Sequence, residues 1–193
     1  MIAAAREGNA VLQVGHVERF NPAVETLLAA AIAPKAIRAI AARRMSAASA
    51  RVTDIDVVTD LMVHDLDVVL ALKGGDVCGV QAAGNDDHAV ALLRFAYGGV
   101  ATLTASRLTA TRTRDLDVTD DDAFFHLDYI ARTVTRTLKR GPDQMASAQL
   151  AVPNADALAA QLADFVRCVR AKARPRVSGE DALAVMRTAW KIQ

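Results

Sequence analysis

The sequence is poor in cysteine, because Cys78 and Cys168 are the only two in 193 residues. They form no Cys-x-x-Cys pair and have no spacing typical of a metal site, so a disulfide scaffold and a zinc module are excluded. Two buried free thiols in a reducing cytosol are the simplest expectation. A chain of this length buries roughly 70% of its unfolded surface and needs no such staple.

No charge of one sign dominates, since Lys and Arg number 23, Asp and Glu number 22, and the net charge is +1. No overall field therefore favours nucleic acid or a membrane surface as a partner. No apolar run is long enough to span a bilayer, and residues 1–15 lack the pattern of a signal peptide. We therefore expect a cytoplasmic protein. One basic stretch follows a predicted helix and suits its dipole: Arg167, Arg170, Lys172, Arg174 and Arg176.

The signals that are present predict helices, then strands, then helices. Asn21-Pro22 is typical of a helix start, Ser178 begins a segment that resembles a capping box, and Gly98-Gly99 predicts a hairpin turn. The predicted helices are residues 2–8, 21–32, 56–72, 154–172 (capped by Asn154) and 178–193. The predicted strands are residues 10–14, 35–43, 77–83, 88–97, 100–107, 112–118, 123–129 and 131–138, followed by a polar connection over 141–153.

This succession predicts an α+β fold with a mostly antiparallel open sheet and helices on one face. Residues 100–107 alternate apolar side chains with small polar ones. The apolar side should lie under the helices, and the polar side should form an uncovered face. The apolar set is Ala101, Leu103 and Ala105, and the polar set is Thr102, Thr104 and Ser106.

A stripe of ionisable residues crosses the predicted helix over 56–72. At about 100° per residue, Asp60, His64 and Asp67 fall within about 60° on one face, and apolar residues occupy the rest. A histidine held between carboxylates has a raised pKa and can exchange a proton with a sugar hydroxyl. A solvated helix face accounts for the same spacing. A metal site is disfavoured, because Asp60 and His64 supply only two ligands.

The segment GHVERFNP, residues 15–22, joins the first predicted strand to the capped helix. Arg19 is suited to contact an anion, a carboxylate or a sugar oxygen. A surface pair of Arg19 with Glu18 and a purely structural cap at Asn21 explain the same residues equally well.

Together GHVERFNP and DLMVHDLD, residues 60–67, resemble the Gfo/Idh/MocA family of oxidoreductases. The second domain of that family is entered through a segment like GHVERFNP and carries a D-x-x-x-H motif on a helix lining a sugar site. The resemblance implies that His64 and Asp60 are catalytic, with His64 moving the proton of the oxidised carbinol. It also implies that Asp67, Arg19 and Asn21 bind substrate, and that Arg19 faces the nicotinamide. Segments 102–107 and 177–182 look like the family too, so the resemblance covers nearly the whole chain.

The sequence departs from the family's first domain. No G-x-G-x-x-G turn, which would admit a pyrophosphate to a helix N-terminus, occurs among the ten glycines. No lysine precedes proline, as the family's Glu-Lys-Pro segment requires. We therefore expect residues 1–15 to be the end of a dinucleotide-binding Rossmann domain that is otherwise missing, and residues 16–193 to be the substrate-binding and dimerisation domain. A truncated gene, a split protein and an excised fragment each fit this pattern.

The expected function is the substrate-binding part of an NAD(P)-dependent dehydrogenase that oxidises a sugar or nucleotide-sugar carbinol and is inactive alone. NAD or NADP serves the complete family architecture, and neither is expected to bind this chain by itself. GHVERFNP looks most like members acting on nucleotide-activated amino sugars, the UDP-N-acetylglucosamine 3-dehydrogenases. The alternative is a non-catalytic sugar-binding or dimerisation module on the same fold, and a metal-dependent hydrolase is a remote third.

The resemblance also implies two protein contacts. One is a homodimer through the open face of the sheet. The other is apolar surface where the missing Rossmann domain would pack, formed by the predicted strand over 10–14 and by a stripe on the last helix. That stripe consists of Leu183, Met186 and Trp190.

Overall fold

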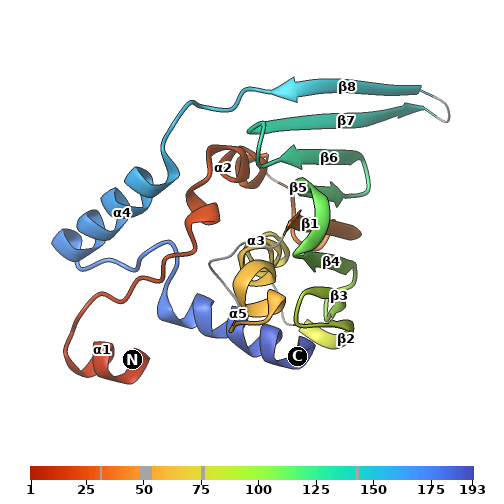
Figure 1. The fold of residues 1–193 in the computed structure, drawn as a ribbon. Coiled ribbons are helices and arrows are strands. Elements are labelled where there is room, and N and C mark those ends of the chain that lie inside the picture. The colour runs from red at the N-terminus through yellow and green to blue at the C-terminus, as the bar shows by residue number, and fades with distance from the viewer. Residues whose placement is uncertain (31, 48–53, 75–76, 142–143) are drawn as a thin grey trace.

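The computed structural model describes residues 1–30, 32–47, 54–74, 77–141 and 144–193. Its centre is an eight-stranded sheet (Figure 1). The strands are β1 (Ala39–Ala47), β2 (Val77–Asn85), β3 (His88–Phe95), β4 (Val100–Ser106), β5 (Leu108–Thr119), β6 (Ala123–Asp128), β7 (Thr133–Gly141) and β8 (Gln144–Leu150). Their order is β2-β3-β4-β1-β5-β6-β7-β8, and only β1 and β4 pair in parallel. The predicted α+β class with a mostly antiparallel open sheet is confirmed.

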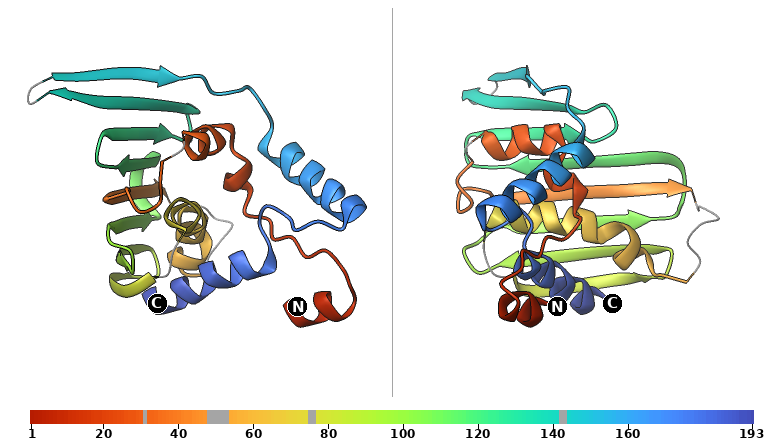
Figure 2. Two further views of the ribbon diagram at one scale, coloured as in Figure 1. Left: turned by 180° about the vertical axis from the view of Figure 1, so that it is seen from behind. Right: turned by 90° about the vertical axis from the view of Figure 1, so that its left-hand side faces the viewer.

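The described helices lie on one side of the sheet, and no described helix covers the opposite face (Figure 2). They are α1 (Ile2–Glu7), the 3-10 turn η1 (Val17–Phe20), α2 (Pro22–Ala29), the π-helical turn η2 (Val58–Met62), α3 (Val63–Lys73), α4 (Ala157–Ala171) and α5 (Gly179–Ile192). Contacts join α2 to β6 and β7, α3 to β1 and β4, and α5 to α3 and β2. In contrast, α1 and α4 stand apart from the sheet (Figure 1).

The core lies between the sheet and α2, α3 and α5. In β4 the predicted alternation holds: Ala101, Leu103 and Ala105 are at most 1% exposed under the helices. Thr102 is exposed on the other face, as expected. Ser106 differs from the expectation, because it is fully buried and its Oγ accepts a hydrogen bond from the Leu108 amide.

Three local signals place the ends of elements as predicted. The Asn21 side chain caps α2, and Ser178 forms a capping box with Asp181 at the start of α5. Gly74 ends α3 in the left-handed conformation with φ of 55°, which glycine adopts without steric cost. These signals depend on contacts within a few residues of the chain.

Two strand predictions were wrong. Residues 10–14 form no strand, because the only described pairing there is a single bridge between Gln13 and Ser178. An apolar run becomes a strand only when a neighbour is present to pair with it. The predicted polar connection over 141–153 contains β8, whose small residues pair with β7 and leave little hydrophobic signal.

Two smaller predictions also need correction. Asp156, not Asn154, caps α4, and its side chain accepts a hydrogen bond from the Ala159 amide. Cys168 is buried as expected, but Cys78 is exposed, because it lies on β2 at the edge of the sheet.

Candidate functional site

The segment GHVERFNP forms the turn η1 and the start of α2, and its polar side chains Glu18, Arg19 and Asn21 form hydrogen bonds with one another or with neighbouring elements. Asn21 is buried: its Oδ1 accepts a hydrogen bond from the Ala23 amide, and its Nδ2 donates to Glu18 Oε2 at 3.0 Å. Glu18 Oε1 in turn accepts a hydrogen bond from Arg44 Nη1 at 3.0 Å. Asn21 is therefore more than a helix cap, because it also holds the Glu18 carboxylate.

Arg44 connects this segment to α3 from the neighbouring strand β1. Its Nε and Nη2 donate to the two carboxylate oxygens of Asp65, both at 2.9 Å, and both side chains are 3% exposed. Burial opposes the charge of Arg44, but the carboxylates of Asp65 and Glu18 outweigh it and raise its pKa. Such a two-pronged pair fixes the position of a side chain as well as its charge. The first turns of α3 are thereby anchored to the sheet.

His64 lies beside this pair on α3. Its ring is half-buried, and its Nδ1 is buried without a hydrogen-bond partner among the described residues. Burial and the charge of Arg44 lower its pKa, and they prevail over the opposing charges of Asp65 and Glu18. The expected rise in pKa is therefore wrong, because burial and a nearby guanidinium outweigh the carboxylates. The lowered pKa favours the neutral form of the His64 imidazole.

His16 is a second imidazole in the same cluster, which the sequence analysis did not single out. Burial lowers its pKa to about 4, and the charges of His64 and Arg19 contribute to the shift. The two histidines are thus electrostatic neighbours although 48 positions separate them in the sequence. In the sequence, only the position of His16 within the segment GHVERFNP connected it with the candidate site.

Asp60 has a charged neighbour of its own, Arg107. It belongs to η2, where its Oδ2 is 3.8 Å from Arg107 Nη1. Arg107 is buried and also donates to the backbone carbonyls of Ile55 and Asp86. The π-helical turn η2 overlaps the start of the D-x-x-x-H motif. Such a turn is a distortion of the helix that is often found at functional sites. Within the predicted stripe, the Asp60 carboxylate therefore has Arg107 as its charged neighbour.

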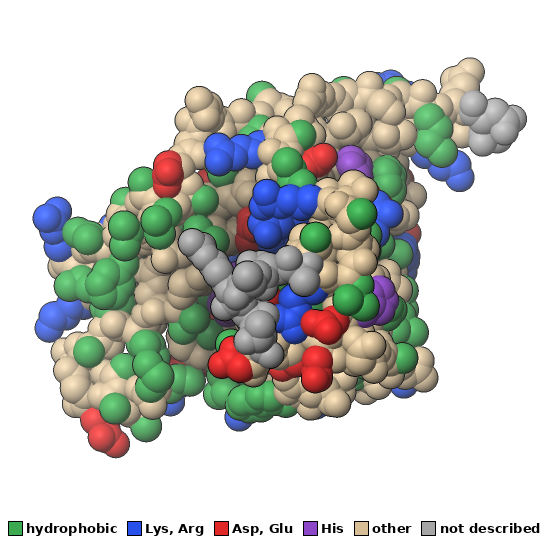
Figure 3. All heavy atoms as spheres, in the orientation of Figure 1, with side chains coloured by type: hydrophobic (Ala, Val, Ile, Leu, Met, Phe, Trp, Pro, Cys, Tyr) green, Lys and Arg blue, Asp and Glu red, His purple; other side chains and the backbone are tan. Residues whose placement is uncertain are grey.

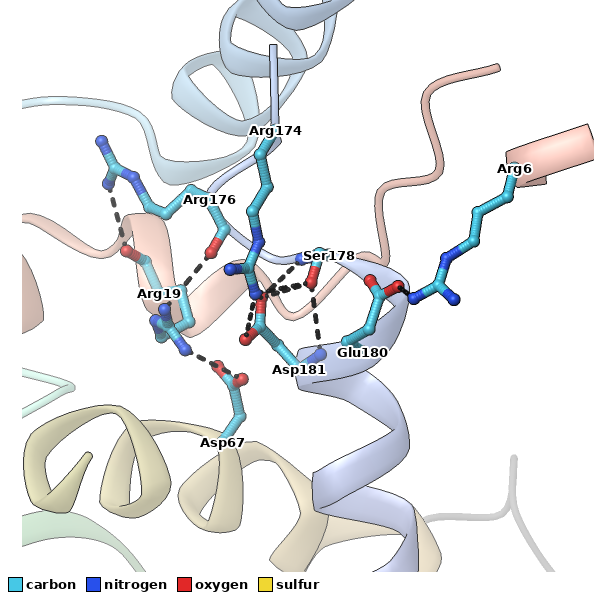
Figure 4. A network of polar contacts seen from close by, with 8 residues as sticks. All are labelled: Arg6, Arg19, Asp67, Arg174, Arg176, Ser178, Glu180 and Asp181. Atoms are coloured by element: carbon cyan, nitrogen blue, oxygen red, sulfur yellow. Dashed lines mark hydrogen bonds and ion pairs between the residues drawn. The ribbon is translucent and has the colours of Figure 1, made fainter. Parts of the chain in front are cut away.

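Asp67 pairs with Arg19 across α3 and η1 (Figure 4). Arg19 Nη1 donates to Asp67 Oδ1 at 3.2 Å, and Arg19 Nη2 donates to the Arg176 carbonyl at 3.3 Å. Asp67 is 1% exposed, and its Oδ2 has no hydrogen-bond partner among the described residues. Burial raises the pKa of Asp67 to about 7, against the opposing charge of Arg19. The alternative of a surface pair between Arg19 and Glu18 is wrong, since each has a different partner.

A cavity of about 400 Å³ adjoins this ion pair. Arg19 and Asp67 line it together with Asp181 from the start of α5. Arg174 donates to Ser178 and to Asp181 in the same region (Figure 4). The polar groups around the cavity therefore come from distant parts of the chain.

The described parts of the chain offer neither a metal site nor a membrane-spanning helix. No group of three or more His, Cys, Asp or Glu side chains there could hold a metal ion. No described helix is both long enough and apolar enough to cross a membrane.

Comparison with known proteins gives the family. Residues 46–126 match the family model of the GFO/IDH/MocA C-terminal domain. This chain carries a Gfo/Idh/MocA C-terminal domain. The match includes η2, α3 and the strands β2 to β5, and therefore the residues around His64.

The relatives of this Gfo/Idh/MocA domain are oxidoreductases. A UDP-N-acetylglucosamine 3-dehydrogenase of Acidithiobacillus ferrooxidans is 32% identical over 183 residues, covering 89% of this chain and 58% of the relative. A solved structure of the enzyme from that organism matches 99% of this chain and 63% of its own, with a TM-score of 0.92 and 30% identity. The chain thus spans less than two thirds of the length of these relatives.

More distant structures confirm the fold alone. An oxidoreductase from Magnetospirillum magnetotacticum has a TM-score of 0.84 at 23% identity and covers the whole chain and 66% of its own. A levoglucosan dehydrogenase solved with NADH and levoglucosan has a TM-score of 0.76 at 15% identity, over 96% of this chain and 65% of its own.

Proposed function

We propose that this chain forms the substrate side of an NAD(P)-dependent dehydrogenase that oxidises a carbinol of a nucleotide-activated amino sugar. The observation that carries the proposal is the match to a UDP-N-acetylglucosamine 3-dehydrogenase over 99% of the chain. A half-buried neutral histidine inside the matched fold supports it, because sugar oxidation requires a base for the hydroxyl proton.

In this proposal His64 takes the proton of the sugar hydroxyl. Its lowered pKa suits that role, because an imidazole must be unprotonated to accept a proton. Asp60 acts with it from the preceding turn, where Arg107 holds its carboxylate in place. Both residues match the D-x-x-x-H motif on which the resemblance rests.

The substrate side of the proposed site is formed by Asp67, Arg19 and Asn21. The Asp67 Oδ2 is an acceptor without a partner among the described residues, and a sugar hydroxyl is a donor that would satisfy it. Arg19 holds the other oxygen of Asp67 and is the residue we place toward the nicotinamide. Asn21 acts indirectly, by fixing Glu18.

The dinucleotide itself is proposed to bind elsewhere. The glycines of this chain show no G-x-G-x-x-G spacing, and no described helix begins at a glycine-rich turn that would cradle a pyrophosphate. The residues described here therefore do not fit a dinucleotide site. We assign nicotinamide binding to a Rossmann domain that packs against this chain.

Exposed apolar surface away from the sheet supports that packing. Helix α1 has no buried residue, and α4 has two, Asp164 and Cys168. A groove of about 950 Å³ lies between α1 and the segment that joins α4 to α5. The exposed apolar residues on α4 are Leu158, Leu162, Phe165, Val166 and Val169, each between 40% and 56% exposed.

A second proposed contact is a homodimer through the open face of the sheet. No described helix covers that face (Figure 2), and Val90 and Phe124 expose 41% and 40% of their surface on two of its strands. Antiparallel sheets tolerate one solvated face, so the surface suits either water or a second copy.

A fusion protein tests the proposed function. This chain is joined behind the dinucleotide-binding part of the Acidithiobacillus ferrooxidans relative, and reduction of NAD and NADP is followed by absorbance. We expect turnover with UDP-N-acetylglucosamine and much less with free N-acetylglucosamine. Binding of the nucleotide sugar by calorimetry, without turnover in any fusion that folds, would instead favour the non-catalytic binding module.

The role of His64 is tested in the same fusion by His64→Asn. Loss of a general base is expected to lower kcat by about 10²–10⁴ while leaving nucleotide-sugar binding within a few-fold. His126→Asn is the matched control, since His126 bonds to Asp117 on the open face of the sheet. A His64→Asn enzyme within a few-fold of the parent would remove His64 from the mechanism.

A further inference from the structure

Two arginines on β5, Arg112 and Arg114, form no ion pair with any described residue, although Arg114 lies beside the His64 cluster. Arg114 is half-buried, and Arg112 is exposed two positions before it. Neither side chain forms a hydrogen bond or an ion pair with another residue in the described part of the chain. Most arginines near them are paired, as Arg43 is with Asp115 and Arg44 with Asp65.

The register of the sheet brings Arg114 to the cluster. Arg44 on β1 is directly opposite Arg114 on β5, so both residues lie on the helix-covered face. Asp115 is next to Arg114 in sequence but pairs with Arg43, a residue of the opposite face. Glu18 and Asp65 already bond to Arg44. Acidic side chains at this end of the sheet are therefore already engaged with other arginines.

Like charges accumulate at this point. Burial, followed by the positive charges of Arg44 and Arg112, lowers the pKa of Arg114. The charge of Arg114 in turn contributes to the lowered pKa of His64, which shows that the two groups share one electrostatic environment. Lys and Arg side chains gather visibly over the ends of β1 and β5 (Figure 3). A bound anion would relieve this repulsion.

The spacing of the two arginines suits an anion with two linked groups. Residues two apart on one strand are about 6.6 Å apart along it. Each planar guanidinium can donate two parallel hydrogen bonds to phosphate oxygens. Two such groups that converge on one ligand match a diphosphate better than a single phosphate.

We propose that Arg112 and Arg114 form the subsite that binds the diphosphate of a nucleotide-sugar substrate, next to the proton-transfer residue His64. This inference rests on the proposed function, and it names the residues that select an activated sugar over a free one. The sugar then extends from the diphosphate toward His64, and the arginines place its carbinol.

Calorimetry on the purified chain tests the subsite without any turnover. UDP, inorganic pyrophosphate, inorganic phosphate, free N-acetylglucosamine and NAD are titrated into the parent chain. The variants are Arg112→Gln, Arg114→Gln and Arg114→Lys. Arg140→Gln, an exposed arginine on β7, is the control that removes the same charge. Circular dichroism and unfolding in urea establish whether each variant folds. If Arg114→Gln fails to fold, Arg112→Gln still tests the subsite, because Arg112 is exposed.

We expect UDP and pyrophosphate to bind more tightly than phosphate and to lose about tenfold or more in affinity with Arg112→Gln or Arg114→Gln. Arg114→Lys should recover part of the loss, and Arg140→Gln should change the affinity less than twofold. Unchanged affinity for UDP in both glutamine variants would overturn the subsite, as would a parent chain that binds NAD but not UDP.

The test of the diphosphate subsite and the test of the dehydrogenase activity can fail independently. A fusion that oxidises UDP-N-acetylglucosamine, with no loss in either glutamine variant, overturns the subsite and leaves the function standing. A chain that binds UDP through these arginines, in fusions that never turn over, supports the subsite and contradicts the dehydrogenase.

Discussion

At the scale of single residues, Asp67 carries the most unusual charge in the site. It is almost completely buried, and one of its oxygens faces Arg19 while the other has no partner among the described residues. Burial prevails over Arg19 and raises its pKa to about 7. Asp67 therefore changes its charge near neutral pH, although an ordinary aspartate is ionised there.

Asp67→Asn is expected to flatten the dependence of stability on pH. A carboxyl with a raised folded-state pKa contributes stability below about pH 4, and this contribution is lost as the pH rises toward 7. The free energy of unfolding lost over this pH range is at most about 4 kcal/mol. Urea unfolding of the parent and of the variant across this range measures it. Asp122→Asn, an exposed residue, should leave the pH dependence unchanged.

The contribution of His16 to stability changes with pH in the opposite direction to that of Asp67. Its pKa is lowered to about 4, so its contribution to stability is present above about pH 6.5 and is lost as the pH falls toward 4. His16→Gln should therefore lose less stability than the parent between pH 6.5 and 4, by at most about 3 kcal/mol. The same substitution at His88 on β3 is the control. Equal acid sensitivity of parent and His16→Gln would show that burial of His16 does not govern its titration.

At the scale of elements, α4 is the helix least supported by the rest of the fold. Among the described elements its main contact is with η1, and its apolar side chains are largely exposed. Its start therefore depends strongly on the Asp156 side chain, which satisfies the otherwise unpaired Ala159 amide. Asp164, in the middle of α4, accepts a hydrogen bond from the Arg176 amide and pairs with Arg167.

Asp156→Ala is expected to destabilise α4 by about 1 kcal/mol, the usual cost of losing a helix cap. Asn154→Ala should cost almost nothing, because Asn154 lies before the cap. Hydrogen exchange at the amides of the first turn separates the two, since a peripheral helix opens locally before the domain unfolds. Faster exchange in Asn154→Ala than in Asp156→Ala would mean that the helix begins earlier than the structure places it.

At the scale of the whole molecule, the exposed apolar surface on α1, α4 and α5 requires an explanation. Trp190 on α5 is 59% exposed, while Leu183 and Met186 of the same stripe are only partly exposed. Apolar patches of several hundred Å² on a soluble protein mark an interface or an aggregation hazard. We assign this surface to the proposed Rossmann partner.

Trp190 is the only tryptophan, so its fluorescence reports on this surface. In the isolated chain we expect red-shifted emission that acrylamide quenches easily, together with binding of an apolar dye. In the fusion with the dinucleotide-binding part, the emission should shift to the blue and the dye should be displaced. Blue-shifted, protected emission in the isolated chain would show that the surface is already covered, which favours a self-sufficient module.

The proposed dimer is tested by light scattering of the purified chain. A dimer mass is expected at micromolar concentration, and Thr102→Lys should shift the mass toward a monomer, because Thr102 is exposed on the open face. Arg140→Lys provides a control on β7. A monomer mass for the parent at high micromolar concentration would contradict association through the sheet.

Features that depend on neighbours a few residues away were predictable from the residue types alone. The caps at Asn21 and Ser178, the stop at Gly74 and the hairpin at Gly98-Gly99 rest on local hydrogen bonds and on glycine geometry, so their residue types reveal them. The alternation in β4 predicted which side faces the helices. The order of GHVERFNP and DLMVHDLD indicated which segments form the proposed site around His64.

Features that depend on partners distant in the sequence became visible only in the folded chain. Residues 10–14 lack a strand to pair with, and β8 exists because β7 pairs with it. The pKa of His64 falls because folding buries the ring and brings Arg44 from another element beside it. The same folding places Arg114 opposite Arg44 and brings Arg107 beside Asp60. Burial and long-range charge are properties of the packed chain, and no local pattern of residues encodes them.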